Sequence, residues 1–124
     1  FINDAYNAAP TSMTAAITFI HETTIRPEKW LVLGDMLELG DDEQRYHEEL
    51  AEYITPQDFA GVCLYGPRMK WLYDKLQSLF ADTQVVWSEN DYEPIRNTLK
   101  SSTSSNSIIL VKGSRGMALE NVID

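Results

Sequence analysis

The chain has 124 residues and a mass of 14.1 kDa, the size of one ordinary domain. With 44% hydrophobic and 23% charged residues, its composition is that of a folded protein rather than a disordered one. Ten basic against nineteen acidic residues give a net charge of −9, which argues against a nucleic-acid backbone or an anionic membrane as the main partner. A single cysteine, Cys63, excludes an internal disulfide.

No targeting or membrane segment is visible. No apolar stretch approaches the roughly 20 residues that a membrane-spanning helix needs. The first residues, FIND, contain neither an initiator methionine nor the basic start of a signal peptide. We therefore expect a cytoplasmic domain that begins inside a longer polypeptide.

Short β-rich runs alternate with helical periods along the chain. Apolar and β-branched runs predict strands at 1–6, 30–33, 61–65, 84–87 and 108–112. Apolar residues at three- and four-residue steps predict helices that begin near Ser12, Glu43, Met69 and Ser88, and after Gly116. The first helix should end at Arg26-Pro27, and the second should run past Ile54.

Capping signals precede two of these helices. Thr11 or Ser12, directly after Pro10, could cap the first one. Ser88, with Asp91 three residues later, resembles a capping box at the start of the fourth.

Five strands interleaved with helices predict an α/β fold with a mostly parallel sheet of about five or six strands between two helical layers. The strands are continuous apolar runs rather than alternations, which fits burial on both faces of the sheet. We expect one domain over residues 1–124.

Ligands of open α/β sheets bind outside the carboxyl ends of the strands. The three least generic segments follow such ends: DAYNAAP at 4–10, LGDMLELG at 33–40 and VKGSRGM at 111–117. Each contributes polar or charged groups, so we expect the three to converge on one crevice.

Each candidate residue has a functional and a structural interpretation. Asp4 could accept hydrogen bonds from ribose hydroxyls, or it could cap a helix or a turn. Asn7 could bind a ligand amide or carboxylate, or it could shape its loop. Asp35 follows a glycine at a strand end, a position common to ligand sites and to turns. His47 could reach the crevice, although a surface or capping role is the more common one.

The segment from Lys112 to Arg115 gives the sharper signal. Two cations, a glycine turn and a following helix N-terminus predict an anion site for a carboxylate or a phosphate. No zinc-ligand spacing, hydrolase elbow, P-loop or dinucleotide glycine pattern occurs in the sequence. If the chain handles a nucleotide, we expect another domain to hold the phosphates.

The three motifs, in this order and at these separations, resemble the C-terminal domain of Mur ligases over essentially the whole chain. The closest resemblance is to the type that joins D-alanyl-D-alanine to UDP-N-acetylmuramoyl-tripeptide in peptidoglycan precursor synthesis. The resemblance implies a Rossmann-like C-terminal domain of a three-domain, ATP-dependent ligase that works through an acyl phosphate. It also implies that the central domain holds most of the ATP and the Mg²⁺, so we expect the isolated chain to be inactive.

For the nucleotide, the resemblance implies that Asp4 binds the ATP ribose and that Tyr6 and Asn7 line the crevice shared with the acceptor. The family pattern D-x-Y-N-A-N-P has asparagine where this chain has Ala9. That difference removes one side-chain amide and leaves Asp4 and Asn7 in place.

For the acceptor, the resemblance implies that Asp35 orients the incoming dipeptide, together with Asn7. Lys112, Ser114 and Arg115 become candidates for holding a substrate carboxylate. His47 lies where the family often has a histidine after the acidic loop, which makes it a further candidate.

Two other classes of protein stay open. A receiver-like signalling domain would also place an aspartate (Asp35) and a lysine (Lys112) at strand ends, but it needs an acidic pair after the first strand, which this sequence lacks. A non-catalytic Rossmann-like binding module would fit the fold without the chemistry.

Overall fold

The computed structural model describes residues 2–4, 9–23, 28–81, 84–114 and 117–122, the first range by its backbone. In chain order, its strands are β1 (Ile2–Asp4), β2 (Glu28–Gly34), β3 (Gly61–Tyr65), β4 (Val85–Ser88) and β5 (Ser107–Lys112). They form one sheet in the order β1-β5-β2-β3-β4, and every neighbouring pair is parallel. The predicted α/β fold with a parallel sheet is confirmed, at the lower of the two expected strand numbers.

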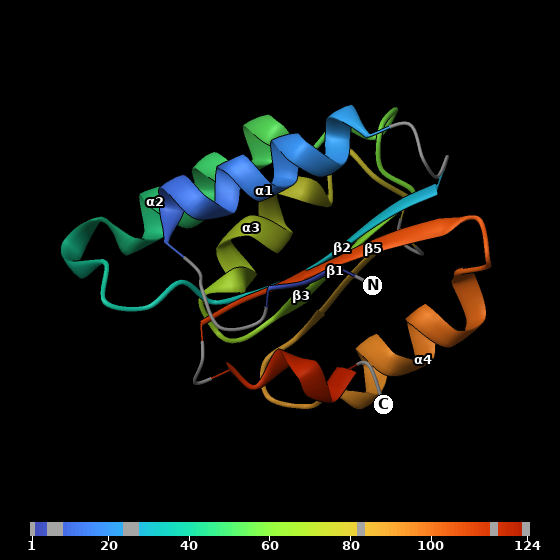
Figure 1. The fold of residues 1–124 in the computed structure, drawn as a ribbon. Helices are drawn as coiled ribbons and strands as arrows, with labels where there is room; N and C mark the ends of the chain where they lie inside the picture. Colours follow the sequence, from blue (N-terminus) through green and yellow to red (C-terminus); the bar gives the residue numbers. More distant parts are fainter. Residues whose placement is uncertain (1, 5–8, 24–27, 82–83, 115–116, 123–124) are drawn as a thin grey trace.

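Four α-helices connect the strands: α1 (Pro10–Glu22), α2 (Glu43–Glu49), α3 (Met69–Leu76) and α4 (Glu93–Ser102). Short 3₁₀ helices add η1 (Gly40–Asp42), η2 (Leu50–Tyr53) and η4 (Leu119–Val122). As Figure 1 shows, α1, α2 and α3 cover one face of the sheet, while α4 and the red segment near the C-terminus cover the other. No helix in the described ranges is long and apolar enough to cross a membrane.

Each face of the sheet has its own apolar core. On the α1 side, Leu31 and Leu33 of β2 pack with residues such as Ile17 and Leu72. On the α4 side, Val32 packs with residues such as Ile95 and Leu119. Successive β2 residues therefore point to opposite cores, which is why the central strands contain continuous apolar runs. Cys63 is fully buried and lies in the α4-side core.

The helix starts differ from the sequence-based expectation. The first helix begins at Pro10, and the Ser12 hydroxyl both accepts from the Ala9 N–H and donates to the Ala9 carbonyl, at 3.1 Å each. The fourth begins at Glu93 rather than at Ser88. Ser88 Oγ accepts the Asp91 N–H at 3.1 Å, and Asp91 then accepts the Glu93 N–H at 2.9 Å. A chain of two side-chain acceptors thus leads into the helix in place of a capping box.

Several helix ends also differ. The first helix ends at Glu22, before the expected stop at Arg26-Pro27. The predicted helix from Glu43 past Ile54 divides into α2 and the tighter η2. The last predicted helix is the 3₁₀ turn η4 within the described residues.

Candidate functional site

The strand ends that carry the three motifs lie side by side. Asp4 at the end of β1 pairs with Lys112 at the end of β5, and Lys112 pairs with Leu33 of β2. Gly34 at the end of β2 then pairs with Tyr65 of β3. We call this end of the sheet the carboxyl edge. The three strand ends are therefore adjacent, and the expected common crevice stays a prediction.

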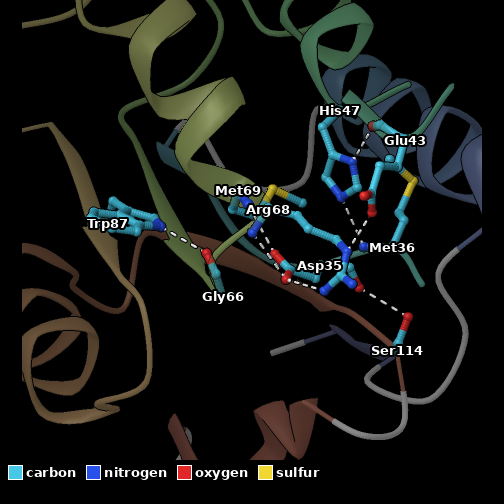
Figure 2. A network of polar contacts seen from close by, with 9 residues as sticks. All are labelled: Asp35, Met36, Glu43, His47, Gly66, Arg68, Met69, Trp87 and Ser114. Carbon is cyan, nitrogen blue, oxygen red and sulfur yellow. Dashed lines mark hydrogen bonds and ion pairs between the residues drawn. The ribbon is translucent and has the colours of Figure 1, made fainter. Parts of the chain in front are cut away.

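Asp35 follows β2 and is fully buried, with 0% of its surface exposed. Its Oδ1 accepts the Met69 N–H at 2.9 Å, and its Oδ2 accepts the Arg68 N–H at 3.1 Å, as Figure 2 shows. These N–H groups lie at the start of α3, with Arg68 at its N-cap and Met69 as its first residue, where a helix has free donors and a partial positive charge. The carboxylate of the second motif therefore binds the start of α3.

Gly66 makes room for that carboxylate. Its φ of +113° is a conformation that residues with a side chain rarely adopt. A Cβ added there would lie 2.4 Å from Asp35 Oδ1. Trp87 of β4 donates its indole N–H to the Gly66 carbonyl at 2.8 Å, which holds the turn from the other side. A glycine is therefore required where the chain passes over the Asp35 carboxylate.

Arg68 joins two acidic side chains from different elements. Its Nε donates to Glu43 Oε1 of α2 at 2.6 Å, and its Nη1 lies 3.4 Å from Asp35 Oδ2. The side chains of Arg68 and Glu43 are each 36% exposed, whereas that of Asp35 is buried. The three charged groups thus tie β2, α2 and α3 together, with one carboxylate in excess.

His47 of α2 is also fully buried, at 0% exposure, so the expectation of a surface role is wrong. Its Nε2 accepts the Met36 N–H at 3.0 Å, and its Nδ1 lies 2.6 Å from the Glu43 carbonyl oxygen. Since one nitrogen faces a donor and the other an acceptor, these partners assign the neutral ring with its proton on Nδ1. The ring also meets Trp71 edge to face, at 5.9 Å between centroids.

Burial moves both titratable groups toward their neutral forms. It raises the pKa of the Asp35 carboxyl, against the hydrogen bonds from the Arg68 and Met69 N–H groups, which lower that pKa. It lowers the pKa of His47, against the Glu43 carbonyl and the Asp35 charge, which raise that pKa. A neutral His47 near pH 7 agrees with the hydrogen bonds assigned to its two nitrogens.

The third motif contacts the second directly. Ser114 donates its hydroxyl to the Asp35 carbonyl at 2.9 Å, and its N–H points to the same oxygen at 3.4 Å. Lys112 is 1% exposed and shares the α1-side face with Leu110, because side chains alternate along β5. Hydrogen bonds from Ser114 thus join the turn after β5 to the loop after β2. The buried Lys112 ends β5, the strand between β1 and β2.

Other predicted site residues are less fully described. Tyr6, Asn7 and Arg115 lie outside the described residues. Asp4 is placed by the register of β1 alone. Their proposed roles in binding stay predictions. Ala9, where the family pattern has asparagine, lies directly before α1 and is exposed.

The sequence reasoning did not find Gly66, Arg68 or Glu43 as parts of this network. The sequence does contain a signal for Gly66, because Gly66-Pro67 follows β3 at the same edge of the sheet at which Gly34-Asp35 follows β2. In the described ranges, no three His, Cys, Asp or Glu side chains are arranged to hold a metal ion. The described polar groups at the carboxyl edge mostly bind one another. These hydrogen bonds and ion pairs fix the backbones of the loops that follow the strands.

Comparisons with known proteins agree with the motifs. A family model described as "Mur ligase, glutamate ligase domain" matches residues 1–115. The UDP-N-acetylmuramoyl-tripeptide–D-alanyl-D-alanine ligase of Bacillus subtilis is 38% identical over 122 residues, which are 98% of this chain and 26% of that protein. The ligase of the same name from Rickettsia prowazekii is 36% identical over 123 residues, 99% of this chain and 26% of that protein. The chain thus spans about a quarter of the length of these relatives.

Solved structures resemble this fold. The MurF ligase of Thermotoga maritima in complex with ADP matches with a TM-score of 0.76 and 26% identity, covering 96% of this chain and 26% of that one. MurF of Acinetobacter baumannii matches in fold, with a TM-score of 0.77, 24% identity and the same coverage. With its three motifs adjacent at one edge and its whole length aligned to these relatives, the chain belongs to the Mur ligase family, as a counterpart of its C-terminal, glutamate ligase domain.

Proposed function

We propose that residues 1–124 form the substrate-binding C-terminal domain of an ATP-dependent, three-domain ligase that joins D-alanyl-D-alanine to UDP-N-acetylmuramoyl-tripeptide. The observation that carries the proposal is the 38% identity to a ligase of that name over 98% of this chain. The step belongs to peptidoglycan precursor synthesis, and the proposal includes the cytoplasmic location expected from the sequence.

In the reaction that the family resemblance implies, ATP transfers its γ-phosphoryl group to the tripeptide carboxylate and ADP leaves. The neutral amine of D-alanyl-D-alanine attacks the acyl carbon, and the tetrahedral intermediate collapses to the amide and phosphate. Such a reaction needs a positioned amine and donors where negative charge resides or develops. A domain that closes over a separate ATPase domain can supply the first of these.

On the acceptor side, Lys112, Ser114 and Arg115 are proposed to hold the dipeptide carboxylate, and Asn7 and Asp35 to orient the dipeptide. The contacts of Asp35 support an indirect role, because both of its carboxylate oxygens already accept N–H groups of α3. We therefore propose that Asp35 orients the acceptor by fixing the loop that follows it and the start of α3.

On the nucleotide side, Asp4 is proposed to bind the ATP ribose, with Tyr6 and Asn7 beside it. The position of Asp4 next to Lys112 at the carboxyl edge supports a common crevice for nucleotide and acceptor. As the family resemblance implies, we assign Mg²⁺ and the phosphates mainly to the central domain of the ligase.

The test is ADP release by the full-length parent protein with ATP, Mg²⁺ and UDP-N-acetylmuramoyl-tripeptide. Acceptor dependence is compared for D-alanyl-D-alanine, D-glutamate and no acceptor. We expect release that depends on the dipeptide, and none from the 124-residue chain alone. Release that depends on D-glutamate would keep the family and overturn the acceptor, and ligation by the isolated chain would overturn the need for the other domains.

The receiver-like alternative makes a contrary prediction. A phosphoryl-accepting aspartate must be reached by its donor, whereas Asp35 is 0% exposed and binds two N–H groups of α3. We expect acetyl phosphate to leave this chain unlabelled. Labelling that is lost in Asp35→Asn would favour the receiver.

A further inference from the structure

The loop between β2 and α2 contains a residue with a side chain, Glu38, in a backbone conformation that favours glycine. Within it, Glu38 has a φ of 62° and Gly40 a φ of 72°. The left-handed conformation is ordinary for glycine but costs a residue with a side chain roughly 1–2 kcal/mol. Such a residue keeps this conformation only when the surrounding structure imposes it, and such residues cluster at functional sites.

One imidazole contacts both ends of this loop. His47 accepts the N–H of Met36, directly after Asp35, and lies against the carbonyl of Glu43, the first residue of α2. We call these two contacts the His47 bridge, and Figure 2 shows them. Both His47 and Met36 are 0% exposed, so water does not replace the imidazole as the acceptor for the Met36 N–H in the folded chain.

We propose that His47 is a positioning residue for acceptor binding. As the neutral imidazole with its proton on Nδ1, it joins the two ends of the 36–42 loop and so holds the segment after Asp35 in its binding shape. The inference rests on the proposed function, because the loop matters for catalysis only if the carboxyl edge receives the acceptor.

The bridge is specific to one protonation state. A proton added to Nε2 would face the Met36 N–H, so the protonated ring cannot keep both contacts. The charged groups that face the ring are Asp35 from β2, Glu43 from α2 and Arg68 from the turn before α3. The two carboxylates favour protonation and Arg68 opposes it, while burial favours the neutral ring. Acid should therefore open the bridge.

The first experiment observes the bridge without any activity. The 124-residue chain, labelled with ¹⁵N-histidine, gives two imidazoles, and the second is His21, a surface group 2.8 Å from Asp58. At pH 7.5 we expect His47 to show a protonated Nδ1 and an unprotonated Nε2 that couples to the Met36 amide proton. A ring protonated on Nε2, or on both nitrogens, would overturn the bridge.

The second experiment uses the full-length ligase and two variants. His47→Phe keeps a ring and removes both contacts. His47→Gln keeps an uncharged acceptor for the Met36 N–H, because the glutamine amide lies at the same distance along the side chain as Nε2 of the imidazole. We expect the phenylalanine variant to raise KM for D-alanyl-D-alanine roughly tenfold or more, with a smaller change in kcat, since an unpaired buried N–H costs a factor of this order.

The glutamine variant and the pH profile separate positioning from folding. We expect His47→Gln to restore KM at pH 7.5. Protonation of the dipeptide amine raises KM in acid for every protein, and we expect the further acid-side rise that the unchanged protein shows to be lost in His47→Gln. His21→Gln, the matched control, should keep that rise. Equal KM values for all three proteins across pH 5.5–8 would overturn the positioning role.

The two proposals fail in different ways. Full-length protein that releases no ADP with the dipeptide would overturn the proposed function and the acceptor role with it, while the histidine spectrum still shows whether the bridge exists. Dipeptide-dependent release with unchanged KM in His47→Phe would leave the function standing and overturn the positioning role alone. If His47→Phe does not fold, the KM of His47→Gln against pH decides.

Discussion

A carboxylate at each end of β2 accepts two hydrogen bonds from a neighbouring part of the chain, but one carboxylate is partly exposed and the other is buried. Glu28, at the amino end, accepts the hydroxyls of Ser104 and Ser107, both at 2.9 Å, and is partly exposed. Asp35, just past the carboxyl end, accepts two backbone N–H groups of α3 and is fully buried. Each side chain therefore ties a neighbouring connection to the same strand.

The two carboxylates differ in whether water can bind the hydrogen-bond donors that are freed when the carboxylate is removed. Water can reach the serine hydroxyls near Glu28, whereas the Met69 N–H that binds Asp35 is buried. A buried donor without a partner keeps its full desolvation cost, so Asp35 has a structural role that Glu28 lacks. Loss of activity in an Asp35 variant is therefore not enough to show that Asp35 touches a substrate.

The largest expected effect on stability distinguishes Asp35, past the carboxyl end of β2, from Glu28 at the amino end. Asp35→Ala should lower the free energy of unfolding by about 3 kcal/mol, because the buried Met69 N–H, the part-buried Arg68 N–H and the Arg68 side chain lose a charged acceptor. Glu28→Ala, the matched control, should cost less than about 1 kcal/mol. Urea unfolding of the 124-residue chain measures both. Equal costs would mean that burial does not distinguish the two ends.

The turn that covers Asp35 gives the next effect. Gly66→Ala should destabilise the fold by about 2 kcal/mol, since it combines an unfavourable φ with a Cβ placed 2.4 Å from Asp35 Oδ1. Gly40→Ala is the control, because Gly40 also has a positive φ, +72°, but nothing lies within 4 Å of its added Cβ.

Gly40→Ala should destabilise the fold by about 1 kcal/mol, the cost of the unfavourable φ alone. In an Asp35→Ala background, the extra cost of Gly66→Ala should shrink toward this value, because the clashing carboxylate is gone. Fully additive costs would contradict the proposed packing of Gly66 against Asp35.

Much of the fold could be predicted from the sequence because apolar runs and helical periods are local signals. The run at 61–65 coincides with β3, and the helix predicted from Met69 begins there in the structure. The ends of elements were less predictable. Ser88 and Asp91 pass hydrogen bonds along the chain before α4 begins, and such competition between side chain and backbone is hard to read from spacing.

The site was predictable in place but not in its contacts. The rule that ligand sites lie at strand carboxyl ends located Asp35 and Lys112 correctly at one edge. It did not reveal that Asp35 binds Arg68, 33 residues away, or that His47 is buried. Those contacts depend on how α2 and α3 pack over the sheet, which no local pattern of a single sequence encodes.

A smaller effect depends on pH. The pKa of His47 lies below its ordinary value of 6.5, so the unfolded chain takes up this proton first as the pH falls. The stability that the neutral ring contributes is complete above pH 6.5 and declines below it, by at most about 1.4 kcal/mol per pH unit. The raised pKa of Asp35 acts in the opposite sense, since it favours the folded chain as the pH falls toward 3.8.

We therefore expect the free energy of unfolding to decline between pH 6.5 and 5.5, and to decline less in His47→Gln. His21→Gln should keep the decline of the unchanged chain. Urea titrations at several pH values test this. Parallel pH curves for the unchanged chain and His47→Gln would mean that His47 does not carry the acid sensitivity.

The smallest effect concerns the exposed part of the carboxyl edge. Arg68 and Glu43 lie 2.6 Å apart, but each side chain is 36% exposed, so solvent and salt screen their attraction. A double-mutant cycle with Arg68→Met and Glu43→Gln should give a coupling of about 0.5–1 kcal/mol that falls as salt is added. The cycle of Arg68→Met with Asp35→Asn should give a larger and less salt-dependent coupling, because the Asp35 carboxylate is buried. If the pair with Glu43 is instead the stronger and the less sensitive to salt, Arg68 is anchored mainly to α2, and the buried Asp35 carboxylate depends on the α3 N–H groups alone.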